Sequence, residues 1–149
     1  MKARNDIPDD WFWEGKVVET LVHHLEKDGW HLLNIANTAS RARGHDIQAQ
    51  KENRILLIEV KGYPSTSYRD PNRAHEKKRT QPTLQAQHWY AQVLLKAMRL
   101  QTSHPNATVA IGLPDFPRYR TLFDETRFAL QRLNLQIWGV SENGEVTIW

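Results

Sequence analysis

The chain has 149 residues, of which 40% are apolar and 25% are charged, as in an ordinary globular domain. It contains no cysteine, which excludes disulfides, zinc–thiolate sites and thiol nucleophiles. No apolar run approaches the roughly 18 residues of a membrane span, so we expect one cytoplasmic domain over residues 1–149, with no membrane partner. The net charge of +3 is small, and the position of the charges matters more than their sum.

The hydrophobic pattern predicts one helix and three strands in the first half of the chain. The helix, at about 10–27, has an apolar stripe at helical spacing, a cap at Asp9 or Asp10, and an end at Asp28 and Gly29. A polar loop at 37–43 separates the first two strands, and the expected strands are 30–35, 45–50 and 55–61. The third strand is almost continuously apolar, which is typical of a central strand covered on both faces.

The second half predicts a further α/β unit. A long loop over 63–81 leads to a helix at about 83–101, which Thr83 or a neighbour can cap. The later elements are a strand, a helix and two strands, at 108–113, 117–133, 136–140 and 145–148. Asn143 and Gly144 favour a hairpin between the last two strands. The order is α-β-β-β-α-β with an α-β-β extension, which predicts an α/β fold with a mixed central sheet flanked by helices.

The hairpin between the two middle strands is expected to bring two carboxylates together. If Glu52 and Asn53 form the turn, opposed residues have numbers that sum to 105, and Asp46 lies across from Glu59. Like charges directly opposite each other destabilise a sheet, and burial beside apolar side chains adds to that cost. A divalent cation between them would reverse the sign, and two carboxylates are a usual protein contribution to a Mg²⁺ site. The register therefore predicts a shared metal site.

Three further polar residues are expected near this pair. Lys61 follows Glu59 by two residues on the same sheet face, where an ammonium can favour hydroxide and stabilise charge on a phosphate; alternatively, both are surface charges at a strand end. Glu14 extends the apolar stripe of the first helix toward the core, or is simply a first-turn residue favoured by the helix dipole. Gln85, in the first turn of the second helix, can orient water or a phosphate, although a helical Gln is more often plain surface.

The motifs Gly-His-Asp at 44–46 and Glu-Val-Lys-Gly at 59–62 resemble the PD-(D/E)XK nuclease superfamily. The element order over about residues 10–112 is similar to that superfamily's core, and an acidic residue in the first helix is also typical. Gln85 with its aromatic neighbours resembles the Gln-xxx-Tyr element of Mrr-like restriction endonucleases and archaeal Holliday-junction resolvases.

Two positions depart from the superfamily's pattern. His45 stands where the signature proline would be. The fourth residue after Gln85 is Trp89, and Tyr90 falls one later. The second departure bears on the Gln85 assignment.

The resemblance implies a Mg²⁺-dependent DNA endonuclease acting in restriction, repair or recombination, with Mn²⁺ able to substitute. In that scheme Asp46, Glu59 and the backbone carbonyl of Val60 bind the metal, and Lys61 assists the nucleophile. Glu14 and Gln85 complete the expected catalytic set. A 149-residue domain has little room for a separate reading module, so we expect structure-directed or weakly sequence-specific cleavage. The alternatives are a catalytically silent nucleic-acid-binding module or accessory subunit, and a structural or interaction protein.

A basic stretch follows the expected catalytic strand and is predicted to bind the DNA backbone, unless it is only a solvated loop. Its cations are Arg69, Arg73, Lys77, Lys78 and Arg79. One metal centre of this type cuts one strand, so we expect a homodimer, with Trp11, Phe12 and Trp149 as suggested contacts. No Walker-type glycine loop occurs, so a specificity or ATPase subunit would be a separate partner.

Overall fold

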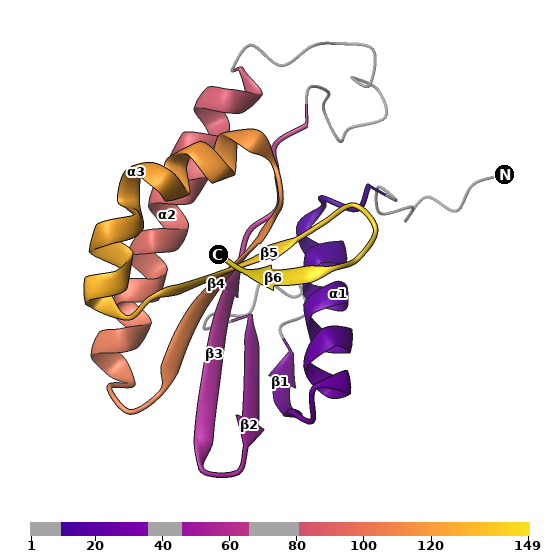
Figure 1. Ribbon diagram of the computed structural model, residues 1–149, viewed down its shortest axis with the longest axis vertical. Coiled ribbons are helices and arrows are strands. Elements are labelled where there is room, and N and C mark those ends of the chain that lie inside the picture. The colour runs from indigo at the N-terminus through magenta and orange to yellow at the C-terminus, as the bar shows by residue number, and fades with distance from the viewer. Residues whose placement is uncertain (1–9, 36–45, 66–80) are drawn as a thin grey trace, which may run out of the picture.

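The computed structural model describes residues 10–35, 46–65 and 81–149 (Figure 1). The described elements are α1 (Glu14–Lys27), β1 (His31–Ile35), β2 (Ile47–Lys51), β3 (Arg54–Val60), α2 (Pro82–Ser103), β4 (Thr108–Pro114), α3 (Pro117–Leu133), β5 (Gln136–Val140) and β6 (Val146–Ile148). The predicted α-β-β-β-α-β order with its α-β-β extension is confirmed. The polar loop expected at 37–43 lies outside the described residues.

The strands form one sheet of six, in the order β1-β2-β3-β4-β5-β6. β1, β2 and β3 are antiparallel, β3, β4 and β5 are parallel, and β6 returns antiparallel to β5. Figure 1 shows α1 on one face of this sheet and α2 with α3 on the other. This mixed sheet with helices on both faces is the α/β arrangement that the sequence predicts. No helix in the described ranges has the length and apolar character needed to cross a bilayer.

Strand β3 is buried on both faces, which explains its nearly continuous apolar sequence. Leu57 packs in the cluster beneath α2 and α3, whereas Leu56, Ile58 and Val60 pack in the cluster beneath α1. Successive side chains of a strand alternate between faces. The side chain of Glu59 therefore lies on the α2 face.

The register of the middle hairpin follows the prediction. Lys51 pairs with Arg54 across the Glu52-Asn53 turn, and the pairing continues without a break to Ile47 and Ile58. Glu52 has a φ of 57°, in the left-handed region that tight hairpin turns require. Each pair of opposed residues sums to 105, so the sequence count was correct along the whole of β2.

Two helix starts differ from the expectation. α1 begins at Glu14 rather than at residue 10, and Trp13 occupies the N-cap position without a side-chain cap hydrogen bond. Asp10 accepts a hydrogen bond from the Trp13 N–H through its main-chain carbonyl, in a turn before the helix. α2 begins at Pro82, so Thr83 is inside the helix and does not cap it. Proline is well suited to the first helical position because its fixed φ is helical and it needs no N–H partner there.

Candidate functional site

Asp46 is attached to β3 on both sides of Glu59. Its main-chain N–H donates to the Ile58 carbonyl at 3.1 Å, and its Oδ2 accepts a hydrogen bond from the Val60 N–H at 2.7 Å. The side chains of Asp46 and Glu59 also share a hydrogen bond. Two ionised carboxylates offer only acceptors, so this hydrogen bond favours the protonated form of the Glu59 carboxyl.

Glu59 is the buried charged residue of this site, with 3% of its surface exposed. Burial, and then the charge and hydrogen bond of Asp46, raise the pKa of the Glu59 carboxyl from 4.5 to about 8. Lys96 lowers that pKa and Glu14 raises it further. At neutral pH and without a cation, the pair therefore retains a proton that an exposed glutamic acid would lose.

Glu14 reaches this region because the start of α1 lies directly against the end of β3. The Tyr63 N–H donates to the Phe12 carbonyl at 3.0 Å. A Cβ on Gly62 would come within 2.7 Å of both the Glu14 nitrogen and the Phe12 oxygen, so this position requires a glycine for the close approach. The negative charge of Glu14 then acts on both Glu59 and Tyr119.

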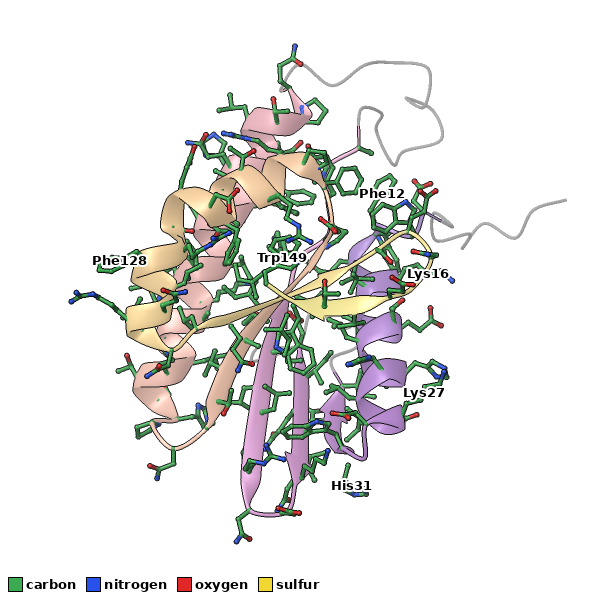
Figure 2. All side chains as sticks on the ribbon, in the orientation of Figure 1. Phe12, Lys16, Lys27, His31, Phe128 and Trp149 are labelled. Carbon is green, nitrogen blue, oxygen red and sulfur yellow. The ribbon has the colours of Figure 1, made fainter. Side chains whose placement is uncertain are left out.

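Aromatic side chains surround this junction. The Tyr63 ring stacks on Phe116 at 3.9 Å between centroids, and Trp11 stacks on Phe116 at 5.1 Å. The fully buried Tyr119 donates its hydroxyl to the Gly62 carbonyl at 2.6 Å. Phe12 meets Phe116 edge-on and lies at the start of α1 (Figure 2). These contacts hold the beginnings of α1 and α3 to the end of β3.

The aromatic residues suggested as dimer contacts pack on their own chain. Trp11 and Phe12 belong to the junction just described. Trp149 packs against Phe123 and beneath the Arg120 guanidinium, which is 4.1 Å from its ring centroid. By contrast, Phe128 points outward from α3 and is 68% exposed (Figure 2). The expected homodimer stays a prediction without an assigned interface.

Lys61 lies on the Glu59 face, and its ammonium sits 5.1 Å from the centre of the Trp89 ring. The cation that acts on Glu59 most strongly is instead Lys96, on the same helix as Trp89. Sequence reasoning missed Lys96. Its spacing of seven residues from Trp89, which places both on one side of a helix, was the available signal.

Gln85 follows the start of α2 on the same side as Trp89, one turn away. Its Oε1 is buried and has no hydrogen-bond partner among the described residues. Tyr90 points elsewhere, and its hydroxyl contacts the Thr126 hydroxyl at 2.7 Å. In this chain the aromatic neighbour of Gln85 on the site side is therefore Trp89, four residues later.

The donor chemistry fits a hard divalent cation, because Asp46 and Glu59 offer only oxygen ligands. The Val60 N–H points to Asp46, whereas the Lys61 N–H donates to Gly112 of β4 at 3.0 Å. In a strand, the N–H and C=O of one residue point to the same neighbour, so the Val60 carbonyl is available on the Asp46 side. No group of three or more His, Cys, Asp or Glu side chains suited to a metal occurs within the described ranges. Two carboxylates nevertheless suffice for Mg²⁺ when water and phosphate complete its shell.

The predicted DNA-binding cations lie outside the described residues, namely Arg69, Arg73, Lys77, Lys78 and Arg79. The structure places five of the other predicted residues at or beside one end of β3, namely Glu14, Asp46, Glu59, Val60 and Lys61. The sixth, Gln85, lies on α2, one turn before the Trp89 that contacts Lys61.

No protein-family model matches this chain, and no curated protein matches it. Among solved structures, it is similar to an FdxN element excision controlling factor protein from Anabaena variabilis, with 17% identity and a TM-score of 0.52. It is also similar to an XisH family protein from Nostoc punctiforme, with 19% identity and a TM-score of 0.50. Each alignment covers 90% of this chain and 95% of the other. At these identities the likeness establishes a shared fold.

Proposed function

We propose that this protein is a Mg²⁺-dependent DNA endonuclease that hydrolyses phosphodiester bonds with structural or weak sequence specificity. The observation that carries the proposal is the buried Glu59 carboxyl, hydrogen-bonded to the half-buried Asp46 at the end of the central strand. A purely structural sheet gains nothing from such a pair, because burying acidic groups side by side destabilises the fold. Groups held at this energetic cost are concentrated at functional sites.

Each site residue has a chemical role in this proposal. Asp46, Glu59 and the Val60 carbonyl would hold Mg²⁺, which when bound supplies Lewis-acid chemistry at the phosphate. Glu59 would bind the cation in its ionised form, because a carboxylate ligand must be ionised. Lys61 places positive charge on the same face, where it stabilises negative charge that develops on the phosphate. The unpartnered Gln85 oxygen can accept a hydrogen bond from the attacking water.

The biological setting is proposed from a weaker observation. One protein with this fold is named as a factor that controls excision of an element, which makes recombination-type DNA a reasonable substrate to test. DNA binding through the basic stretch at 69–79, a homodimeric working form, and a separate specificity or ATPase subunit belong to the same proposal.

The test is cleavage of a DNA panel in Mg²⁺ or Mn²⁺, comprising plasmid, linear, single-stranded and branched molecules. We expect the wild-type protein to cut at least one of them and EDTA to abolish the cut. Asp46→Asn, purified in parallel, controls for a contaminating nuclease and should be inactive. Equal cutting by both proteins, or no cutting of any substrate, would refute the endonuclease proposal.

The contact between Lys61 and Trp89 favours a second candidate, a catalytically silent nucleic-acid-binding module. An ammonium held on an indole ring is not engaged with the acidic pair. This alternative predicts that DNA binds equally well with and without divalent cation and that no substrate is cut. Binding assays run beside the cleavage panel separate the two candidates.

A further inference from the structure

One side of α2 carries a continuous stripe of polar, aromatic and basic side chains. Its members recur at steps of four and three residues, and they are Gln85, Trp89, Gln92, Lys96 and Arg99. At 3.6 residues per turn, this spacing keeps them within one narrow side of the helix. The buried face of α2 lies about a quarter turn away and consists of Ala86, Tyr90, Val93 and Ala97. We name the first set the α2 stripe.

The α2 stripe lies on the side of α2 that faces away from α3. The opposite side of α2 contacts α3, where Arg118 donates to the Gln87 amide oxygen at 2.7 Å and Gln101 donates to the Leu133 carbonyl at 2.6 Å. Figure 1 shows the two helices packed side by side on one face of the sheet. At its N-terminal end, the α2 stripe reaches the candidate site through the contact of Trp89 with Lys61.

The C-terminal part of the α2 stripe carries two cations, Lys96 and Arg99, of which Lys96 also acts on the Glu59 carboxyl. The 22 residues of α2 include no Asp or Glu. Lys96 and Arg99 are exposed, and neither forms an ion pair within the described part of the chain. Isolated surface cations are often only solvated. Lys96 and Arg99 differ because they lie on the same side of α2 as Trp89 and Gln85. The row of side chains therefore begins beside the acidic pair and ends with these two cations.

We infer that the α2 stripe is the surface that holds the sugar-phosphate backbone of the substrate strand as it leaves the acidic pair, with Lys96 and Arg99 each contacting a phosphate. The inference rests on the proposed nuclease function and deepens it. Cations along one helix face suit a ligand of regular negative charge and do not read its bases. Gln92 lies between Trp89 and Lys96 and can donate to the same backbone.

The test compares Lys96→Gln/Arg99→Gln with a control of equal charge change, Lys27→Gln/Arg132→Gln, on exposed positions of α1 and α3. Fluorescence anisotropy with labelled single-stranded and duplex DNA, in EDTA and at 50 to 200 mM KCl, measures binding without cleavage. We expect the stripe variant to bind about tenfold more weakly and its salt slope to fall by about 1 to 2, because up to two phosphate contacts are lost. An unchanged slope, or an equal effect from the control, would overturn the inference.

A second measurement uses the absence of cysteine from the chain. Lys96→Cys and the control Lys27→Cys each introduce one thiol, which can be cross-linked to DNA carrying a thiol-reactive group on its backbone. Cross-linking at position 96 should exceed that at position 27 by at least about tenfold, as expected for a bound and an unbound surface. Equal yields would overturn the inference even if the charge variants weakened binding.

Different results would overturn the nuclease function and the role of the α2 stripe. If wild type and the stripe variant both cut DNA and bind it with the same salt slope, the nuclease proposal stands and the α2 stripe is only solvated surface. If the wild-type protein neither binds nor cuts any DNA, the proposed function falls and the stripe inference falls with it.

Discussion

Replacing Glu59 by glutamine would separate the effect of the acidic pair on folding stability from its role in metal binding and cleavage. The Glu59 side chain is 3% exposed, and burial and Asp46 raise its pKa from 4.5 to about 8. Below pH 4.5 the carboxyl is protonated in both the folded and the unfolded chain. As the pH rises, the unfolded chain releases the proton first, so the folded state loses about 1.4 kcal/mol per pH unit until about pH 8. The upper limit of this loss is about 5 kcal/mol.

Glu59→Gln removes this loss, because the amide is neutral at every pH and can still donate a hydrogen bond to Asp46. In EDTA, we expect wild type and variant to have similar stability near pH 4.5. At pH 8.5 the variant should be more stable by a few kcal/mol, which raises its melting temperature by about 5 to 15 °C in a chain of this length. Urea and thermal unfolding measure both values. The exposed Glu142→Gln serves as the control and should change neither.

A divalent cation should reverse the order of stability, so that wild type becomes more stable than Glu59→Gln. Mn²⁺ stabilises wild type because it binds the folded chain, whereas Glu59→Gln lacks one ligand and should gain little. The variant should also fail to cut DNA, so that added stability accompanies lost activity. Parallel pH profiles for the two proteins in EDTA, or equal stabilisation of both by Mn²⁺, would refute the reasoning.

Four further substitutions test the site. Lys61→Ala should lower cleavage by at least about a hundredfold while leaving Mn²⁺ affinity and the fold nearly unchanged, because an ammonium is no metal ligand; wild-type turnover would contradict its role. Asp46→Asn should remove the Mn²⁺ site seen by calorimetry, and equal binding by wild type would show that the pair holds no cation. Gly62→Ala should lower the free energy of unfolding by about 1 to 3 kcal/mol, since its Cβ meets the α1 backbone, and unchanged urea unfolding would contradict that contact. Gln85→Leu should lower activity without loss of stability, because it removes a buried unpartnered oxygen; a large destabilisation would mean that Gln85 is structural.

The sequence alone determined the order of the elements and the register of the central hairpin. A strand alternates strictly between its two faces, and a two-residue turn leaves one way to pair Lys51 with Arg54. Counting from that turn predicted Asp46 directly opposite Glu59, but the ladder ends one residue earlier, at Ile47 and Ile58. Asp46 follows on from β2, and its side chain contacts Glu59 and the Val60 N–H. Strand alternation by itself placed Lys61 on the same face as Glu59.

Only the tertiary structure decided how the helices meet this hairpin. Periodicity shows which residues share one face of α2, but it does not show how that helix is rotated over the sheet. The contact of Lys61 with Trp89 and the attraction between Lys96 and Glu59 both join segments far apart in the chain. The start of α1 at Glu14 likewise lies against Gly62, a long-range contact that the local preference for an acidic cap does not reveal.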